Sequence, residues 1–536
     1  MTPPKLSRRG FLLASAAGAL ATSGCSDDTP TAAPSGTGAG SSIVPASTTT
    51  LKVPELSGDP FTLGVASGDP LPDRVILWTR LAPEPATGGG MPAEPASVLW
   101  EVATDDSFAT LVSSGVAEAT PEHAHAVHVD VTGLQADSWY HYRFRIGTFT
   151  SPIGRTRTAP ATDAEPDQLR FAMASCQAWE AGFYNAYRDL VSTELDVVVY
   201  LGDYIYEYAA SAAVGKDAVR LGRGPECRTL EQYRDRYALY KSDPLLRDAH
   251  AHCPWIVIWD DHEVQNNYAA ENSQDSSITP EAFAQRRAAA YQAWWEHQPV
   301  RLEAPTGPEY QIYRELSWGT LANFIMLDER QYRTDQACGD RTLQLTPPCD
   351  EVRAAGRTMT GPDQQQWFFD RLNSSRSTWN IVGNEVVMTD VTLNGAVLNF
   401  DQWDGYPEQR ETVLKYIRDN QFTNVVMITG DIHLNGVGNL ALAGADGTRT
   451  TVATELVGTS ISSGGLLPDG VGDLVKASIP DLVYFNQQRG WCHNTVTAEK
   501  WTAEYRVVED NLVEDSPVTV GGTFVITPDR PGAVAA

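Results

Sequence analysis

Six short apolar segments of the chain each end in side chains that can bind a metal ion or a phosphate group. They span residues 169–176, 197–203, 255–262, 323–330, 379–385 and 424–433. A short apolar run between helical stretches is typical of a buried strand in a sheet that is covered on both faces. In such sheets the binding crevice lies outside the carboxyl ends of the strands. We therefore expect the polar ends to converge on a polynuclear metal site, which makes an enzyme the leading hypothesis.

Length and composition set limits on the architecture. A chain of 536 residues exceeds one typical domain, so we expect two or three domains. The net charge of −28 argues against a nucleic-acid-binding surface, which needs a basic patch. The acidity does not exclude phosphate chemistry, because cations can make a site locally positive while the surface stays acidic.

Residues 1–25 are predicted to be an export leader. The pair Arg8 and Arg9 precedes an Ala-rich apolar stretch, a pattern similar to a bacterial twin-arginine signal. The stretch is too short for a stable membrane span. Its end at Cys25 is similar to a lipoprotein processing site, but Thr22 replaces the apolar residue that is usual there. We expect export to the periplasm or the extracellular medium by the twin-arginine machinery, and lipid attachment at Cys25 stays open.

Two further regions precede the predicted catalytic domain. Residues 26–55 are rich in Ser, Thr, Ala, Gly and Pro and are expected to form a disordered linker. Residues 56–160 contain short alternating segments between Gly and Pro turns, which is typical of a small β-sandwich. The segment 134–142 is similar to the corner-tyrosine region of fibronectin type III-like domains. We expect this sandwich to pack against the next domain, and a ligand-binding module is the alternative.

Residues 165–510 are predicted to form a layered domain of the α/β or α+β class, with two mixed sheets flanked by helices. The expected helices are 182–193, 230–250, 280–297, 361–373 and 407–420. Residues 511–536 are expected to be a C-terminal strand and a tail that frays from residue 529.

The cysteines are assigned by position. Cys338 and Cys349 bracket a Pro-containing loop and are disulfide candidates in an oxidising compartment. Cys227 and Cys253 could form a second bridge. Cys492 is then left over and is interpreted as a buried free thiol.

The first predicted ligands follow two of the apolar runs. Asp203 ends a strand, where its two oxygens could bridge two cations. Tyr206 could reach the same cation from the following turn, and a phenolate favours a hard ion such as ferric iron. Cys176 would bind a metal as a thiolate. The alternatives are an aromatic strand end packed in a core and a buried structural cysteine.

A second group of predicted ligands surrounds a histidine. Asp260 and Asp261 are adjacent carboxylates that need cations nearby, because buried like charges are costly. Asn266 and Asn267 offer neutral oxygen ligands suited to calcium or another divalent ion. His262 could bind metal, contact phosphate or donate a proton to a leaving group.

The remaining candidates lie at the other three runs. Asp431 and His433 follow a strand and a glycine, which lets the backbone approach closely. Arg330 is a candidate phosphate clamp because a guanidinium can bind phosphate oxygens in bidentate fashion, and an ion pair with a neighbouring carboxylate is the alternative. Asn384 is a further candidate for metal or substrate. The chain has no Gly-x-Ser-x-Gly elbow, so no serine nucleophile is expected.

Taken together, these motifs are similar to those of the calcineurin-like metallophosphoesterases. Ser175-Cys176 in place of the first Asp motif, and the forms of segments 260–263 and 430–433, resemble the PhoD-type alkaline phosphatases and phosphodiesterases. The resemblance covers nearly the whole chain. It implies a secreted hydrolase of phosphate monoesters and diesters with one Fe³⁺ and two Ca²⁺ ions, a different divalent metal being the alternative.

The resemblance also implies a role for each ligand. The iron ligands, with Asp203 bridging, would be Cys176, Asp203 and Tyr206. The calcium ligands would be Asp261, Asn266 and Asp431. Asp260, Asn267 and Asn384 are less firmly assigned, and His433 could bind either the iron or a calcium ion. Arg330 and His262 would stabilise the transition state or assist the leaving group. Glu329 stands where the family often carries a small residue.

Two alternatives stay open. Within enzymes, the alternative is a phospholipase D-like phosphodiesterase, since some relatives of this family cleave phospholipids. Outside enzymes, it is a calcium-dependent extracellular binding protein with a decayed site, and the unbroken ligand set argues against it. The expected partners are phosphate ester substrates and the export machinery, and the chain is expected to be a monomer.

Overall fold

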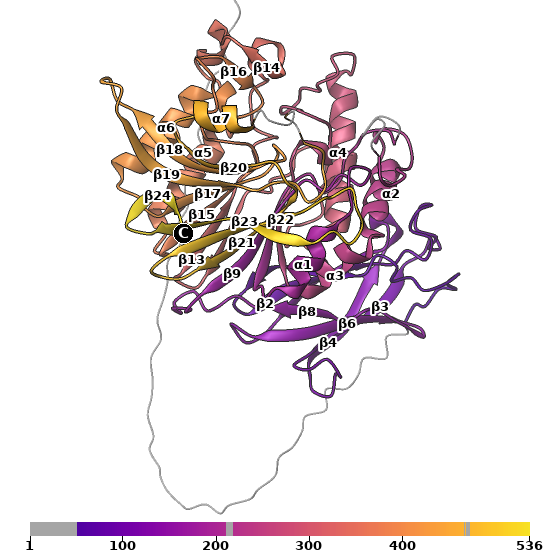
Figure 1. Cartoon of the computed structure of the whole chain (residues 1–536). Helices are drawn as coiled ribbons and strands as arrows, with labels where there is room; N and C mark the ends of the chain where they lie inside the picture. The colour runs from indigo at the N-terminus through magenta and orange to yellow at the C-terminus, as the bar shows by residue number, and fades with distance from the viewer. Residues whose placement is uncertain (1–50, 211–217, 466, 468–471) are drawn as a thin grey trace, which may run out of the picture. The chain divides into compact units, whose positions relative to one another are not determined.

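Two β-sheets form the centre of the fold (Figure 1). The computed structural model describes residues 51–210, 218–465, 467 and 472–536; the predicted leader, Cys25 and the linker up to residue 50 lie outside these ranges. In spatial order, the ten-stranded sheet consists of β24 (Arg530–Ala535), β23 (Val518–Thr527), β22 (Trp501–Val508), β21 (Gly490–Val496), β9 (Leu169–Ala174), β10 (Val197–Leu201), β11 (Trp255–Ile258), β1 (Val65–Leu71), β2 (Arg74–Arg80) and β5 (Ala126–Thr132). The seven-stranded sheet consists of β12 (Arg314–Trp318), β13 (Ala322–Met326), β15 (Trp379–Asn384), β17 (Val425–Thr429), β19 (Arg449–Val457), β18 (Asn435–Ala443) and β20 (Leu482–Asn486).

The six predicted buried strands are confirmed, three in each sheet. In the first sheet β9, β10 and β11 are neighbours and parallel, and in the second β13, β15 and β17 are neighbours and parallel. A core joins the two sheets. The rings of Phe171 and Phe324 pack edge to face at 5.7 Å between centroids, as do those of Trp379 and Trp501 at 5.7 Å. The carboxyl ends of the three parallel strands of each sheet therefore lie together, at the same end of the core between the sheets.

Helices cover the outer faces of the sheets. They are α1 (Asn185–Ser192), α2 (Leu230–Lys241), α3 (Pro244–His252), α4 (Pro280–His297), α5 (Gly361–Ser374), α6 (Pro407–Asp419) and α7 (Gly472–Ser478). Phe368 of α5 and Leu414 of α6 pack in the same core as Val382 of β15. Within the described part of the chain, every helix falls short of the length and apolar character that crossing a bilayer requires.

The single helix expected over residues 230–250 is wrong, because the chain forms α2 and α3 there. Pro244 cannot continue a helix, since it has no amide proton to donate. The Asp243 side chain accepts the amide protons of Leu245 (2.9 Å) and Leu246 (3.3 Å) and so caps α3. The remaining expected helices agree with α1, α4, α5 and α6 to within a few residues.

The N-terminal sandwich shares a sheet with the layered domain that follows it. One of its sheets is formed by β4 (Leu111–Ala119), β3 (Ala96–Ala103), β6 (Trp139–Ile146), β7 (Phe149–Thr150) and β8 (Gly154–Arg157). The opposite strands β1, β2 and β5 continue the ten-stranded sheet, and Gly68 of β1 is paired with Trp255 of β11. A Cβ atom at Gly68 would lie 2.2 Å from the carbonyl oxygen of Pro299, so the close approach of the two domains requires glycine.

Two expectations about the sandwich can be compared with the structure. The Gln135 amide donates to the Tyr140 hydroxyl at 2.9 Å, as a corner tyrosine requires. Residues 51–55, expected in the linker, begin the sandwich instead. The Lys52 amide donates to Ser97 Oγ at 3.0 Å, and the Ser97 amide donates to the Lys52 carbonyl at 2.7 Å.

The expectation that the chain frays from residue 529 is wrong. Residues of β24 pair with β23 at the edge of the ten-stranded sheet. The amide of Gly532 donates to Thr454 Oγ1 and that of Ala533 to Asn439 Oδ1, both at 2.9 Å. These bonds attach the last strand to the second sheet, which explains why it is ordered.

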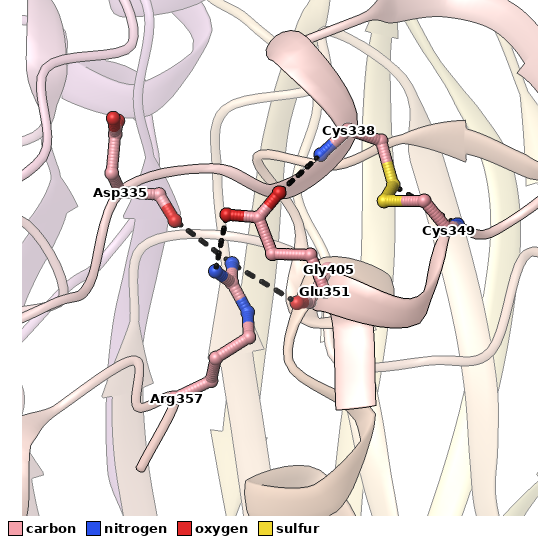
Figure 2. The surroundings of a disulfide bond; sticks show 6 residues. All are labelled: Asp335, Cys338, Cys349, Glu351, Arg357 and Gly405. Carbon is pink, nitrogen blue, oxygen red and sulfur yellow. Dashed lines mark hydrogen bonds and ion pairs between the residues drawn. A yellow bond between two sulfur atoms is a disulfide. The ribbon is translucent and has the colours of Figure 1, made fainter. Parts of the chain in front are cut away.

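The disulfide between Cys338 and Cys349 is confirmed, with Cα atoms 5.8 Å apart (Figure 2). It closes the loop that contains β14 (Thr342–Thr346), which pairs with β16 (Val397–Asn399). Figure 2 also shows Glu351 accepting the Cys338 amide at 3.2 Å and facing Arg357. A bridge between Cys227 and Cys253 is wrong, because both are buried free thiols; Cys492 is a buried free thiol, as expected.

Candidate metal centre

Side chains from the carboxyl ends of both parallel strand sets converge between the sheets. Cys176, Asp203 and Asp260 each lie two residues beyond the end of β9, β10 and β11, and Asp431 lies two beyond β17. Their potential ligand atoms form three adjoining groups, within each of which the atoms lie no more than 4.8 Å apart. The groups are Cys176, Asp203 and His433; Asp203, Asp261 and His262; and Asp260, Asp261 and Asp431. Because Asp203 and Asp261 each belong to two groups, they link the three into one cluster.

Tyr206 belongs to the first group through its hydroxyl. Its Oη lies 2.9 Å from Asp203 Oδ2 and 2.9 Å from His433 Nε2, and it accepts a hydrogen bond from Ser463 Oγ at 2.8 Å. His433 Nδ1 lies 2.7 Å from the Gly464 carbonyl, which can only accept. This contact places the proton on Nδ1 and leaves the Nε2 lone pair directed at the group, as in metal-ligating histidines.

The backbone at the strand ends is strained in a way that aims these side chains. Cys176, Asp203, Asp431 and His433 have φ values of 58°, 56°, 67° and 52°, in the left-handed region that non-glycine residues avoid. Such strain gathers at functional sites, where surrounding contacts hold it. Here Glu263 supplies contacts: its carboxylate accepts the amide protons of Asp203 at 3.0 Å and Tyr204 at 2.5 Å.

The carboxyl groups of the cluster outnumber the cationic side chains that contact them, Arg330 and His262. Burial raises the pKa of Asp203 and Asp431 well above the usual range, and neighbouring carboxylates add to the rise. Burial, together with the charge of Asp203, likewise raises the pKa of Cys176. Burial raises the pKa of Asp260 to about 6, whereas at Asp261 the nearby Arg330 overcomes burial and lowers the pKa to about 2.

The donor atoms fit bound cations. Asp260 Oδ2 and Asp261 Oδ1 are buried and accept no hydrogen bond from any described residue. Arg330 Nη2 lies 3.6 Å from Asp261 Oδ1, whereas no ion pair reaches Asp260 Oδ2 among the described residues, and an unpaired buried oxygen of this kind is costly unless a cation neutralises it. The first group offers sulfur, imidazole nitrogen and phenol oxygen, a set suited to iron. The third group offers carboxylate oxygens alone, which suit calcium or another hard divalent ion.

Arg330, expected as a phosphate clamp or as an ion-pair partner, forms ion pairs. Its fully buried guanidinium donates to Asp260 Oδ1 and Asp401 Oδ2, and Nη2 lies 3.5 Å from Asp431 Oδ1. Asp401 also binds Arg333 at 3.0 Å. The guanidinium therefore neutralises and orients carboxylates of the cluster.

His262 is oriented by a carboxylate outside the three groups. Its Nδ1 lies 2.7 Å from Glu207 Oε2, and its ring packs against Tyr206 at 4.2 Å between centroids. Although burial opposes the charged form, Asp261 and Glu207 raise the pKa of His262 well above its usual value. Its side chain is 10% exposed, so solvent still reaches the imidazole ring.

The structure places the three asparagines differently. The backbone N–H of Asn267 donates to Asp261 Oδ2 at 2.6 Å, next to the cluster, and the Asn267 side chain donates to Asp340 Oδ1 at 3.3 Å. The side chain of Asn266 donates to Gln274 at 2.8 Å. The side chain of Asn384 binds Trp403 at 3.1 Å and Thr429 at 3.0 Å. These bonds give Asn266 and Asn384 partners outside the cluster.

Several residues that orient the site were not predicted. They are Glu207, Glu263, Asp401, Gln402 and Ser463. Glu207 and Glu263 follow the Asp203 and Asp260 strand ends closely, so proximity to those motifs was an available signal. Asp401, Gln402 and Ser463 lie in loops with no such pattern.

Family models described as "PhoD-like phosphatase" and "PhoD-like phosphatase, N-terminal domain" match residues 171–505 and 46–160. Alkaline phosphatase D of Bacillus subtilis (strain 168) is 44% identical over 486 residues, which is 89% of this chain and 83% of that protein. A solved structure described as "Structure of PhoD" has a TM-score of 0.87 at 44% identity and covers 90% of this chain and 93% of its own.

Proposed function

Because this chain belongs to the PhoD-like phosphatase family and is a phosphoric ester hydrolase, we propose that it cleaves phosphate monoesters and diesters with cations held by the strand-end cluster. The observation that carries the proposal is the sharing of Asp203 and Asp261 between adjoining ligand groups. Shared carboxylates are suited to holding cations close together, as polynuclear hydrolases require.

We assign the cations by donor type. Cys176, Asp203, Tyr206 and His433 would hold Fe³⁺, since sulfur, phenol and imidazole donors occur together there. Asp260, Asp261 and Asp431 would hold Ca²⁺. Asn267, next to Asp261, is a further candidate, and Asn266 would have to give up its bond to Gln274 to join them. The proposed stoichiometry is one Fe³⁺ and two Ca²⁺, and a different divalent metal is the alternative. When bound, the cations would supply an activated water nucleophile and neutralise charge on the phosphoryl group.

Two cationic side chains would act beside the metal ligands. His262, held at Nδ1 by Glu207, would donate a proton to the departing alcohol. Arg330 would position Asp260 and, through the nearby charge, stabilise the phosphoryl oxygens in the transition state. To bind phosphate directly, the Arg330 guanidinium would have to give up part of its ion pairs with the carboxylates. We therefore propose that the main role of Arg330 is to position Asp260.

Elemental analysis and turnover of the exported protein test the proposal. We expect iron and calcium in the wild type and in Asp446→Asn, a control in an exposed turn. Asp203→Asn should lose metal and activity together, because it removes a shared ligand. Full turnover in a folded Asp203→Asn protein, or a zinc-only wild type, would contradict the proposal.

We also propose that the leader directs twin-arginine export, since that route carries folded proteins with their cofactors loaded. The location would be periplasmic or extracellular, with the chain acting as a monomer. The open question of lipid attachment concerns Cys25, and a shift in mass on Cys25→Ser would reveal it. The complete set of ligand groups argues against a decayed calcium-binding protein.

A further inference from the structure

A polar pocket lies beside α4, outside the three ligand groups of the metal cluster. Residues 270–272, 309–311 and 331–332 form its walls together with Arg287 of α4. Its cavity volume is about 530 Å³, a size typical of sites for small molecules. None of the lining residues belongs to a proposed ligand group, so the pocket is a separate candidate site.

Arg287 is buried in the pocket wall without a counter-charge. The residue is 5% exposed, and its Nε is buried with no hydrogen bond to any described residue. Its guanidinium carbon lies 5.9 Å from the centroid of the Phe283 ring. Burial raises the pKa of a second neighbour, Tyr291, and the charge of Arg287 opposes that rise. Both neighbours are uncharged, and among the described residues no carboxylate forms an ion pair with Arg287, which is costly for a buried cation.

The neighbouring arginine of the same helix shows the usual arrangement. Arg286 is also buried, but its Nε donates to the Tyr233 hydroxyl at 2.9 Å and its Nη1 to Glu226 Oε1 at 2.8 Å. Successive residues of an α-helix point about 100° apart, so the two side chains meet different surroundings. The missing counter-charge therefore belongs to the pocket side of α4, where a bound anion would supply it.

The other polar groups of the wall differ in their availability to a ligand. The Gln331 side chain is bonded within the protein, since it donates to the Tyr310 carbonyl at 2.6 Å and to Asp328 Oδ2 at 2.5 Å. The Tyr332 hydroxyl forms no hydrogen bond with any residue that the structure describes. A ligand in the pocket therefore has the guanidinium and this hydroxyl as donors.

The charges of the pocket are separated by depth. Glu271 and Glu309 line the pocket and are exposed, whereas Arg287 is buried. The negative charges therefore lie nearer to solvent than the positive charge. An anion alone would be repelled by the two glutamates, although solvent screens them. A ligand that also carries an ammonium group would meet an opposite charge at each end.

We propose that this pocket binds a small zwitterion, with its oxyanion group on Arg287 and its ammonium group toward Glu271 and Glu309. A guanidinium suits a carboxylate or a phosphoryl group, because its fork of donors can bind two oxygens at once. Amino acids and aminoalkyl phosphates or phosphonates share this chemistry. The inference goes beyond the proposed function, because the metal cluster takes no part in it.

Calorimetric titration of the metal-loaded wild type and of metal-loaded Arg287→Met tests the proposal. The probes are β-alanine and 2-aminoethylphosphonate, each compared with its analogue that lacks the ammonium group, propionate or ethylphosphonate. Because the metal cluster is the same in both proteins, binding that the substitution removes belongs to the pocket. We expect Arg287→Met to weaken the binding of at least one zwitterion on the order of tenfold to a hundredfold, since a charge-assisted pair is lost.

The probe set also decides between the sources of the ligand. The zwitterion that loses more affinity in Arg287→Met shows whether a carboxylate or a phosphoryl group is preferred. The analogue without the ammonium group should bind the wild-type pocket several-fold more weakly. Equal binding by wild type and Arg287→Met, or equal binding of a zwitterion and its analogue, would overturn the inference. Turnover of nitrophenyl phosphate should be the same in both proteins, so the proposed function is judged separately.

Two further variants separate binding from folding. Arg287→Lys keeps the charge but not the fork of donors, so it should fold and bind the zwitterion several-fold more weakly than the wild type. Arg286→Met is the matched control on the same helix. It should lower the melting temperature, because it leaves Glu226 without this partner, and it should keep wild-type affinity for the zwitterion. Wild-type affinity in Arg287→Lys and Arg287→Met alike would show that Arg287 only packs the helix, and the inference would be wrong.

Discussion

Tyr206 and Asp203 meet at the end of β10, with Oη and Oδ2 2.9 Å apart. The two residues are three positions apart, so one strand and its following turn bring both to the proposed iron. The same hydroxyl lies 2.9 Å from His433, which comes from the other sheet. This contact explains why residues so distant in sequence can form one ligand group.

Tyr206→Phe should therefore abolish the visible absorption that an iron-bound phenolate gives. It removes one oxygen ligand and leaves the packing of the ring against His262 in place. We expect activity to fall roughly 10- to 100-fold, the range seen when groups that support a metal are lost. Absorption spectra and kcat/KM check this, with Tyr208→Phe as the control beside the same histidine. An unchanged spectrum in Tyr206→Phe would remove tyrosine from the iron ligands.

Arg330→Ala should destabilise the protein strongly. The change leaves Asp260 buried without its cation and leaves Asp401 paired with Arg333 alone. Breaking a buried ion pair in this way costs about 3–5 kcal/mol. Arg353→Ala removes an exposed pair with Glu408 and should change the free energy of unfolding by less than about 1 kcal/mol. Denaturant unfolding of both variants makes the comparison. A mild effect of Arg330→Ala on stability, with a large loss of inhibition by phosphate, would favour the clamp instead.

Much of the site could be predicted because a strand end fixes where the next side chain lies. Cys176, Asp203 and Asp431 follow apolar runs that had to be buried strands, and parallel strands end at a common edge. Asp401 could not be found this way, since a loop carries it across to Arg330 and Arg333. Loop paths depend on long-range packing that no local pattern records.

The types of domain could be predicted from the sequence, but the way in which they join could not. Sequence patterns indicated the sandwich and the layered domain, yet not that β1, β2 and β5 extend the larger sheet. That continuity depends on the close approach of Gly68 to Trp255, which joins residues far apart in the chain. The last strand was missed because its anchors, Thr454 and Asn439, lie in the other sheet.

The disulfide should contribute about 3 kcal/mol. The bridge closes a loop with a sequence separation of 11 residues, for which the loss of chain entropy in the unfolded state gives a value of this order. A Cys338→Ser/Cys349→Ser variant should melt at a lower temperature than the wild type. Reducing agent should lower the wild-type melting temperature and leave that of the variant unchanged. Equal melting temperatures for oxidised wild type and variant would show that the loop opens locally before global unfolding.

Because of Lys241, the free energy of unfolding should increase as the pH rises into the alkaline range. The Lys241 amino group is buried near His250 Nε2 (3.3 Å) and the Trp78 ring, and burial lowers the pKa of Lys241 well below its usual value. Between the folded and unfolded pKa values, the unfolded chain binds a proton that the folded chain lacks. The free energy of unfolding therefore rises with pH, by about 1.4 kcal/mol per unit, until the unfolded value near 10.4 is passed.

Lys241→Met removes this titration and isolates its effect. The variant should be more stable than the wild type at pH 7, and the difference should shrink as pH rises toward 10. Lys415→Met, at an exposed pair with Glu411, should show no such trend. Urea unfolding at several pH values between 7 and 10 measures both differences. A Lys241→Met difference that stays constant over this range would mean that the lysine is charged in the folded protein, held by groups that outweigh its burial.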